Sequence, residues 1–214
     1  MKVPIKDIMN GIEYASTRKI ADGQVGGITA DSRSVGRGYM FVAVKGHSAD
    51  GFAFIEGAVR RGARVIVTEK GVNLPDGVIN ITVADTRKAL PAMAANFYGS
   101  PSGKLKTVCV TGTNGKTTIT YLLESIINAS GKKTGVIGTI NYRLGKMSVP
   151  AINTTPGPVE LQSLLREFIR KGAGYAVMEV SSHSLDQGRV DNIAFDAAVI
   201  TNVTGDHLDY HKTM

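Results

Sequence analysis

Residues 111–118 read Thr-Gly-Thr-Asn-Gly-Lys-Thr-Thr, and these residue types in this order are typical of a loop that binds phosphates. The backbone N–H groups of a Gly-rich turn, together with a helix N-terminus, bind anionic oxygens. The ammonium group of Lys116 can reach the β- and γ-phosphates of a nucleotide, and the hydroxyl of Thr117 can ligate Mg²⁺. We therefore predict nucleotide binding here, in preference to a Gly-rich turn that merely precedes a lysine.

The loop is shorter than the full pattern G-x-x-x-x-G-K-[ST]. The position five residues before Gly115 is Val110, and the first glycine comes later, at Gly112. An apolar run, Val108–Val110, precedes the loop and a helical pattern follows it. A phosphate-binding loop needs this strand and this helix on either side, so the context supports the prediction.

The helix after the loop is predicted from apolar residues at i, i+3, i+4, i+7 and i+8, which form one face of a 3.6-residue period. These residues are Ile119, Leu122, Leu123, Ile126 and Ile127. Gly131 ends the helix, and the run Thr134–Ile140 has the length and composition of a buried parallel strand. Together the elements make one βαβ unit, in which phosphates bind at the carboxyl ends of the strands.

Two later strands should bring polar side chains to the same end of this sheet. The strand at 175–180 finishes in Glu179, and the strand at 195–201 ends near Asn202 and Asp206. The loop at 153–158 precedes a helix, for which Pro158 suits the first turn. The apolar face of that helix consists of Leu161, Leu164, Leu165, Phe168 and Ile169. A carboxylate at this end of the sheet is what a bound Mg²⁺ needs.

Two histidine-containing clusters allow more than one interpretation. The spacing of His207 and His211 suggests zinc, but the metalloprotease motif needs Glu directly after the first His, where this chain has Leu208. We therefore disfavour a zinc site at residues 206–211. An ordinary polar loop exposed to solvent is the other alternative to a functional cluster there. The second cluster, residues 179–183, places a carboxylate, two hydroxyls and an imidazole at a strand end. His47 considered alone suits a turn better than a ligand site.

Residues 1–99 have their own alternation of strands and helices, which predicts a separate small α/β domain. The expected strands are 40–44, 64–68 and 78–83, and a short helix ends at Gly62. Asp85 is expected to cap a later helix, whose apolar face consists of Leu90, Met93, Ala94 and Phe97. The segment 98–104 is rich in Gly, Ser and Pro and is the best linker. We predict one domain at 1–101 and a second, containing the phosphate loop and a mainly parallel sheet, at 102–214.

Composition excludes several classes of protein. The chain has 214 residues, is 43% hydrophobic and contains no run of 18 apolar residues, and we expect no signal peptide because residues 1–7 lack an apolar stretch. The net charge is +7, but the basic residues are scattered, so we expect no nucleic-acid partner and no membrane partner. The single cysteine, Cys109, lies in an apolar strand and is expected in the core, which favours a cytoplasmic protein.

Several motifs in order along the whole chain resemble the Mur ligase family, most closely the MurE type, which adds the third residue of the peptidoglycan stem peptide. The resemblance rests on segments 31–33, 46–51, 111–118, 153–156, 178–185 with Gln187 and Arg189, and 206–211. It implies an N-terminal UDP-binding domain and the first part of a central domain that binds ATP and Mg²⁺.

The resemblance also implies a role for particular residues. The UDP part would contact Ser32, His47, Ser48 and Ala49. The muramoyl-peptide part would contact Asn153, Thr154, Thr155, Ser181, Gln187 and Arg189. ATP would be held by Gly112, Thr113, Asn114, Gly115, Lys116, Thr117 and Thr118, and Mg²⁺ by Thr117, Glu179 and His207. Lys116, Glu179 and His207 would be the catalytic residues.

The implied reaction joins an amino acid to UDP-N-acetylmuramoyl-L-Ala-D-Glu by way of an acyl phosphate. The amino acid would be meso-diaminopimelate or, as the alternative, L-lysine. Members of the family are much longer than this chain, so we expect an N-terminal fragment that binds its ligands without turnover. We also expect this chain to be monomeric. Another Mur-type or folylpolyglutamate-type ligase is a related alternative, and a P-loop ATPase without ligase activity is an alternative of a different class.

Overall fold

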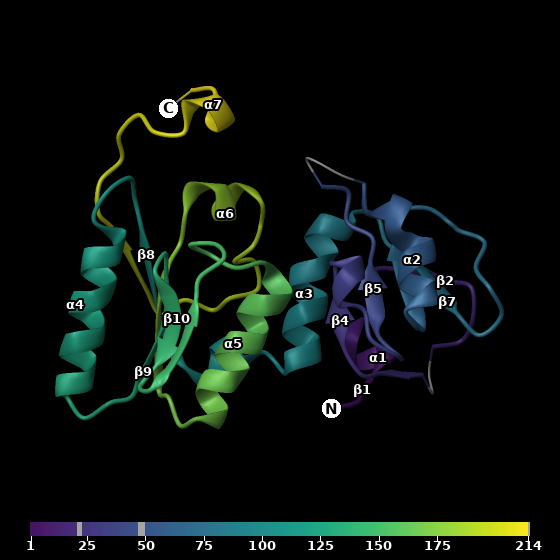
Figure 1. Ribbon diagram of the computed structural model, residues 1–214, viewed down its shortest axis with the longest axis horizontal. Helices are drawn as coiled ribbons and strands as arrows, with labels where there is room; N and C mark the ends of the chain where they lie inside the picture. The colour runs from purple at the N-terminus through teal and green to yellow at the C-terminus, as the bar shows by residue number, and fades with distance from the viewer. Residues whose placement is uncertain (21–22, 47–49, 214) are drawn as a thin grey trace. The chain divides into compact units, whose positions relative to one another are not determined.

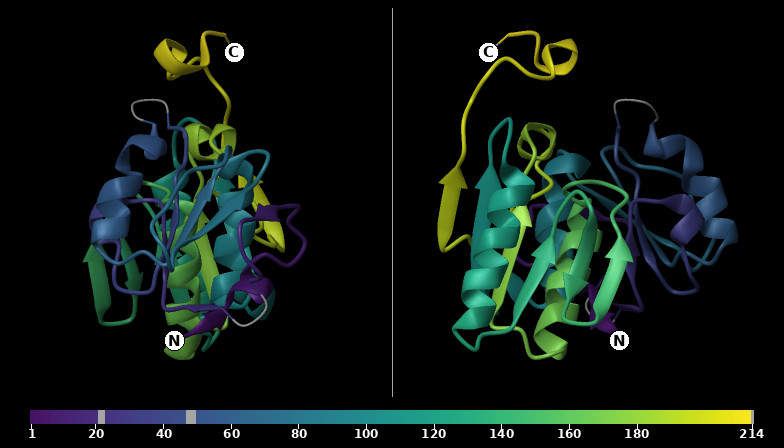
Figure 2. Two further views of the ribbon diagram at one scale, coloured as in Figure 1. Left: turned by 90° about the vertical axis from the view of Figure 1, so that its right-hand side faces the viewer. Right: turned by 60° about the vertical axis from the view of Figure 1, so that its left-hand side comes forward.

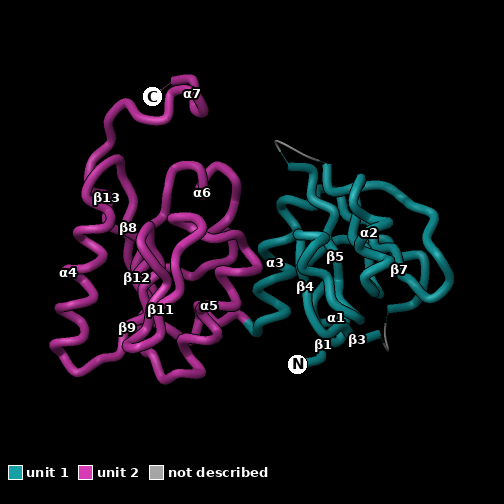
Figure 3. Tube along the Cα trace, in the orientation of Figure 1, with its two compact units in different colours: residues 1–99 teal, residues 100–214 magenta. Residues whose placement is uncertain are grey.

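A computed structural model of the chain describes residues 1–20, 23–46 and 50–213. The chain forms two compact units, residues 1–99 and residues 100–214, each with its own sheet (Figure 3). The predicted boundary after residue 101 lies two residues further along the chain than this division. In the described residues, no helix is both long enough and apolar enough to cross a membrane.

Unit 1 contains a five-stranded sheet in the order β2-β7-β6-β5-β4, in which only β2 is antiparallel to its neighbour. Its strands are β2 (Ala15–Ser16), β4 (Ile28–Thr29), β5 (Met40–Val42), β6 (Val65–Thr68) and β7 (Ile79–Thr82), and β1 (Val3–Pro4) pairs separately with β3 (Gln24–Val25). Its helices are α1 (Ile5–Ile8), α2 (Ile55–Arg60) and α3 (Thr86–Tyr98), with 3-10 turns η1 at Ser32–Ser34 and η2 at Gly51–Phe54.

The local signals in unit 1 explain its elements. Strands β5 and β6 are buried at every position, which matches their continuous apolar runs. Asp85 caps α3, since its carboxylate accepts from the N–H groups of Arg87 at 2.9 Å and Lys88 at 3.0 Å. The expected linker is more ordered than predicted, because α3 continues to Tyr98 and Pro101–Lys104 forms a 3-10 turn.

Unit 2 contains a six-stranded sheet in the order β11-β10-β9-β12-β8-β13. The strands are β8 (Lys106–Thr111), β9 (Thr134–Ile137), β10 (Asn141–Leu144), β11 (Met147–Pro150), β12 (Tyr175–Glu179) and β13 (Ala197–Ile200). The helices are α4 (Lys116–Ala129), α5 (Pro158–Arg170), α6 (Ser182–Asp186) and α7 (Leu208–His211), and η3 (Pro101–Lys104) begins the unit. The four strands β9, β12, β8 and β13 are parallel, so the mainly parallel α/β fold that the sequence predicts is confirmed.

Helices cover both faces of this sheet, with α4 on one and α5 on the other (Figures 1 and 2). Leu161, Leu165 and Phe168 of α5 pack in one buried cluster with Ile137 of β9 and Met178 of β12. Cys109 of β8 belongs to the same cluster, as expected of a core residue, and burial raises the pKa of its thiol. Because β9, β12, β8 and β13 are parallel, their carboxyl ends meet at one edge of the sheet. The phosphate loop follows β8 at this edge.

One feature of this unit was not predicted, and one prediction is wrong in detail. The apolar stripe of α4 is only partly covered, because Leu122 is 56% and Ile126 is 66% exposed. The helix packs on β8, β9 and β12 along part of that stripe, and helical periodicity alone does not reveal how much of a stripe is covered. The predicted strand 134–140 ends at Ile137, because Gly138 and Thr139 turn away to surround the carboxylate of Glu179.

The hairpin β10–β11 was not predicted. Gly145 occupies its turn with φ +55°, a conformation that favours glycine. Arg143 of β10 forms a largely buried ion pair with Glu124 of α4, and its guanidinium group lies 3.8 Å from the ring centroid of Tyr121. These contacts fix the hairpin to the helix that follows the phosphate loop.

Candidate functional site

The phosphate loop leaves β8 through two glycines with positive φ. Gly112 has φ +129°, and a Cβ built there would lie 2.2 Å from the Thr201 Oγ1 and 2.6 Å from the Asn202 carbonyl oxygen. Gly115, with φ +84°, is the N-cap of α4. Only glycine allows both the backbone conformation and the close approach to the end of β13 at the first position. The loop therefore has the strand–turn–helix geometry that its sequence predicts.

Residues after β13 hold this loop in place. The N–H of Thr113 donates to the Asn202 carbonyl at 2.9 Å, and the N–H of Asn114 donates to the Asn202 side chain at 3.1 Å. The hydroxyl of Thr201 donates to the Asn114 carbonyl at 2.7 Å. Asn202 is thus a support for the loop, a role that the sequence analysis did not assign. In this conformation the N–H groups at the start of α4, from residue 115 onward, are the ones suited to an anion.

Lys116 is folded back over the loop. Its ammonium group donates to the carbonyls of Gly112 at 2.6 Å and Thr113 at 2.9 Å. The charge is therefore already held above the loop, where a phosphate group would lie, and not extended into solvent. A nucleotide would exchange these two carbonyl contacts for phosphate oxygens, which form stronger charge-assisted hydrogen bonds.

Glu179, at the end of β12, is the most buried carboxylate of the site, with 1% of its surface exposed. Its Oε2 accepts from the hydroxyls of Thr117 and Thr139, both at 2.9 Å. Its Oε1 accepts from the N–H of Thr139 at 3.2 Å. The structure thus brings together Thr117 and Glu179, two of the three residues expected around Mg²⁺.

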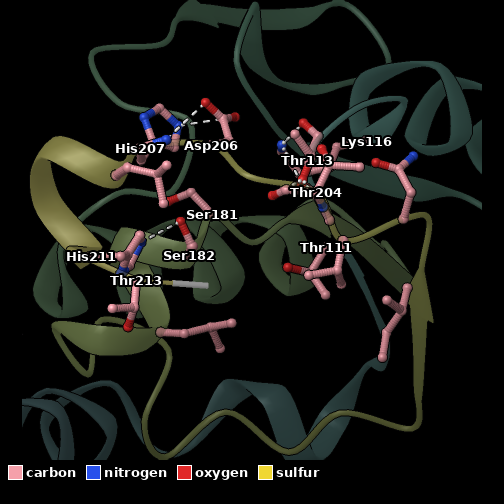
Figure 4. Close-up of a pocket in the computed structure, with 16 residues that line it drawn as sticks. Thr111, Thr113, Lys116, Ser181, Ser182, Thr204, Asp206, His207, His211 and Thr213 are labelled. Carbon is pink, nitrogen blue, oxygen red and sulfur yellow. Dashed lines mark hydrogen bonds and ion pairs between the residues drawn. The ribbon is translucent and has the colours of Figure 1, made fainter.

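His207 lies in a different part of the site. It lines a cavity of about 470 Å³ that is also lined by Lys116, Ser181 and His211. Figure 4 shows Thr113 and Lys116 on one side of this cavity and both histidines on the other. The His207 ring is 3.6 Å from the Asp206 carboxylate and stacks edge-on against His183. None of the hydrogen bonds of the described residues joins His207 to Thr117 or Glu179.

The donors around Glu179 fit magnesium better than zinc. Mg²⁺ prefers oxygen ligands from one or two protein side chains and completes its shell with water and phosphate oxygens. A hydroxyl and a carboxylate 2.9 Å apart at the N-terminus of α4 meet that requirement. In the described part of the chain, no group of three or more His, Cys, Asp or Glu side chains could hold a metal ion.

The residues expected to contact the muramoyl-peptide form a connected network in unit 2. The buried hydroxyl of Thr155 donates to the Glu179 carbonyl at 2.9 Å and accepts from the N–H of Ser181 at 3.1 Å. Arg189 donates to the Thr155 carbonyl and to the Gln187 side chain, both at 2.9 Å.

The other members join this network through tyrosine and threonine side chains. Tyr142 donates to the Asn153 carbonyl at 2.6 Å, and the Thr154 hydroxyl is 3.2 Å from that of Thr139. Gln187 donates to the Tyr210 hydroxyl at 3.2 Å. Tyr142 and Thr139 were missed by the sequence analysis. Thr139 is a polar residue that comes soon after the end of a parallel strand, which is a recognisable signal. The predicted strand ran to Ile140 and therefore included Thr139, so the signal was hidden.

In unit 1, Ser32 lies in η1 beside a cavity of about 820 Å³, which is also lined by Arg33, Phe54, Arg60 and Arg61. The preceding residue, Asp31, accepts from the N–H and guanidinium of Arg33, each at 2.9 Å. Hydrogen bonding to Arg33 lowers the pKa of the Asp31 carboxyl. His47, Ser48 and Ala49, the other residues expected at a UDP site, lie outside the described residues.

The sheet, the Gly-rich loop and the carboxylate at the end of β12 define a P-loop α/β protein. Comparison with known families is more specific. Residues 24–98 match the family described as Mur ligase family, catalytic domain, and residues 110–214 match the Mur ligase middle domain. The chain belongs to the Mur ligase family, as its motifs suggested.

Curated relatives agree with this assignment. The chain is 46% identical over 210 residues to a UDP-N-acetylmuramoyl-L-alanyl-D-glutamate–2,6-diaminopimelate ligase of Geobacter sulfurreducens, covering 98% of this chain and 41% of the relative. It is 49% identical over 191 residues to the ligase of the same name from Aquifex aeolicus, covering 89% of this chain and 39% of the relative. The chain thus spans about 40% of the length of the curated relatives that it matches.

Solved structures give the same result. A structure of a UDP-N-acetylmuramoyl-L-alanyl-D-glutamate–2,6-diaminopimelate ligase aligns with a TM-score of 0.83 and 29% identity, over 99% of this chain and 42% of that one. The MurF ligase from Thermotoga maritima in complex with ADP aligns with a TM-score of 0.61 and 26% identity, over 87% of this chain and 39% of that one.

Proposed function

We propose that this chain carries the UDP-substrate-binding and ATP-binding parts of a peptidoglycan ligase. The complete enzyme would add meso-diaminopimelate, as the third stem-peptide residue, to UDP-N-acetylmuramoyl-L-Ala-D-Glu. The observation that carries the proposal is the buried Glu179 carboxylate, which accepts a hydrogen bond from Thr117. Thr117 directly follows Lys116, whose ammonium group is held at the phosphate loop by the carbonyl of Gly112. The names of the relatives support diaminopimelate over L-lysine as the amino acid.

The proposed reaction has two steps. The D-Glu carboxylate of the substrate attacks the γ-phosphorus of ATP, which forms an acyl phosphate and releases ADP. The amine of the amino acid then attacks the acyl carbon and displaces phosphate, which forms the amide. The first step brings two anions together, so positive charge and correct positioning supply most of the catalysis.

The residues of this chain would share that task. Lys116 and the N–H groups at the start of α4 would hold the phosphates of ATP, with Gly112 and Gly115 shaping the loop around them. Thr117 and Glu179 would hold Mg²⁺, with His207 as the third residue that the family resemblance implies, and the ion would neutralise phosphate charge. Arg189 and Gln187, which already hold one another, would orient the muramoyl-peptide with Asn153, Thr154, Thr155 and Ser181.

In unit 1, Ser32 and the segment 47–49 would contact the UDP part of the same substrate. The cavity next to Ser32 supports this assignment, because its three arginines suit a diphosphate, which would compete for Arg33 and Arg60 with their partners Asp31 and Glu56.

Isothermal titration calorimetry of the 214-residue chain tests the proposal. Separate titrations with UDP-N-acetylmuramoyl-L-Ala-D-Glu and with MgATP are both expected to give saturable binding. Binding of MgATP without any binding of the UDP ligand would contradict the ligase assignment and favour a P-loop ATPase. UDP-N-acetylglucosamine serves as a control for affinity that comes from the UDP group alone.

A further inference from the structure

Thr139 makes three polar contacts at the centre of the site, although no motif marks it. It follows β9 directly after Gly138, and it donates to Glu179 from both its N–H, at 3.2 Å, and its hydroxyl, at 2.9 Å. Its hydroxyl also lies 3.2 Å from that of Thr154. Because a threonine hydroxyl has one proton, the contact with Glu179 makes Thr139 the acceptor from Thr154.

The turn that carries Thr139 is shaped to the carboxylate. A Cβ built on Gly138 would lie 2.3 Å from the Oε1 of Glu179, so only glycine allows the backbone to come this close. An ionised carboxylate has about four lone-pair positions, and Thr117 and Thr139 together fill three of them. The orientation of the buried Glu179 side chain is thereby set, and one acceptor position remains.

We propose that Thr139 is a positioning residue that fixes the Glu179 carboxylate for Mg²⁺ and links it, through Thr154, to the segment 153–155. The inference rests on the proposed function and adds to it a residue outside the predicted nucleotide, substrate and metal sets. Removing the hydroxyl would vacate one of the two occupied acceptor positions on Oε2 of Glu179 and leave Thr154 without its acceptor. The carboxylate would then occupy more than one orientation, so a cation would bind it more weakly.

The effect should be confined to the metal-dependent part of nucleotide binding. No hydrogen bond among the described residues joins Thr139 to the loop at 112–118, so nucleotide affinity without Mg²⁺ should not change. A merely structural turn residue would behave differently. Its replacement would lower the melting temperature but leave the Mg²⁺ dependence as it was.

Thr134 offers a matched control at the other end of the same strand. Its hydroxyl is buried and has no hydrogen-bond partner among the described residues, whereas Thr139 is exposed as a residue and its hydroxyl is bonded to Glu179. Thr134→Val and Thr139→Val therefore make the same change in shape and polarity, while only the second removes a contact to Glu179. Thr139→Ser keeps the hydroxyl and should rescue, and Thr139→Ala provides a second loss of function if the valine variant does not fold.

The experiment measures binding of a fluorescent ADP analogue to the full 214-residue chain while Mg²⁺ is titrated, with a parallel series in EDTA. We expect the half-saturating Mg²⁺ concentration to rise about tenfold in Thr139→Val and Thr139→Ala, and to stay near wild type in Thr139→Ser and Thr134→Val. Unchanged Mg²⁺ dependence in both loss-of-function variants, or a serine variant as defective as they are, would overturn the inference alone. A wild-type chain that binds no nucleotide would contradict the proposed function and with it this inference.

Discussion

The two units hold their proposed ligand-binding side chains in different ways, although both are built on mainly parallel sheets. In unit 2, Glu179 is 1% exposed and accepts hydrogen bonds from two other segments of the chain. In unit 1, Ser32 lies in a partly exposed 3-10 turn, and Asp31, the N-cap of that turn, is held by Arg33, its near neighbour in sequence. The first arrangement depends on the packing of the whole sheet, and the second depends mainly on a local turn.

This difference predicts how each unit responds to substitution. A buried polar network is sensitive because removing one member leaves others without partners. A surface turn loses only the contact that is removed, since water replaces it. Changes at the carboxyl end of the unit 2 sheet should therefore have large effects, and changes around Ser32 should have moderate effects confined to one ligand.

The largest effect is expected for Lys116→Ala. The variant loses the charge on the phosphates and the two contacts to loop carbonyls, so we expect nucleotide affinity to fall by about a hundredfold or more. Calorimetry with MgATP measures the loss, and circular dichroism checks that the fold remains. Retention of wild-type affinity would show that the loop does not bind phosphates.

Gly112→Ala should come next. The substitution forces a side chain into φ +129° and places its Cβ against Thr201 and Asn202, which we expect to cost on the order of 1–3 kcal/mol of stability and most of the nucleotide affinity. Gly131→Ala is the matched control, because Gly131 also has positive φ, +77°, but no atom within 4 Å of its Cβ position. Thermal unfolding of both variants compares the cost of the close approach at Gly112 with the cost of a positive φ alone at Gly131. Equal losses of stability in the two variants would contradict a special role for the close approach at the loop.

Ser32→Ala tests the other side of the comparison. Loss of one hydroxyl contact should weaken binding of UDP-N-acetylmuramoyl-L-Ala-D-Glu about tenfold and leave MgATP affinity unchanged. Ser34→Ala, in the same turn, is the control. If Ser32→Ala weakened both ligands equally, the assignment of separate ligands to the two units would be wrong.

The smallest effect concerns the charge on Asp31. The Arg33 hydrogen bonds lower the pKa of this carboxyl, so the pair stabilises the fold above the ordinary Asp range and ceases to do so as the pH falls through the lowered pKa. In Arg33→Ala, we expect the Asp31 pKa to return toward 3.8, its ordinary value, with little change in melting temperature because the pair is exposed. Carbon-detected NMR titration of the side-chain carboxyl measures this, and an unchanged pKa would show that Arg33 is not its partner.

Much of the fold could be predicted because local patterns determine it. The apolar periodicity of α5 and the Asp85 cap of α3 both led to the correct elements. The exposed stripe of α4 was not predictable, because a periodic pattern shows which residues share a face but not what covers them. The hairpin β10–β11 was missed because its anchor is an ion pair between Arg143 and Glu124, 19 residues apart.

The candidate site divides in the same way. The phosphate loop is contiguous in sequence, so its residue types alone predicted its geometry. The role of Thr139 depends on Glu179, 40 residues later, and appears only when β9 and β12 pair as neighbours in the sheet. The support that Asn202 gives to the loop likewise requires β13 to lie beside β8.

Hydrogen–deuterium exchange of the full chain, with each ligand added separately, tests the central comparison most directly. With MgADP, we predict slower exchange in segments 111–120 and 137–141 and at the start of α6, and no change around Ser32. With UDP-N-acetylmuramoyl-L-Ala-D-Glu, we predict protection of segment 30–34 in unit 1 together with segments 153–155 and 187–189 in unit 2. Protection of 30–34 by MgADP, or of 111–120 by the UDP ligand alone, would contradict the assignment of the nucleotide site to unit 2 and the UDP site to unit 1.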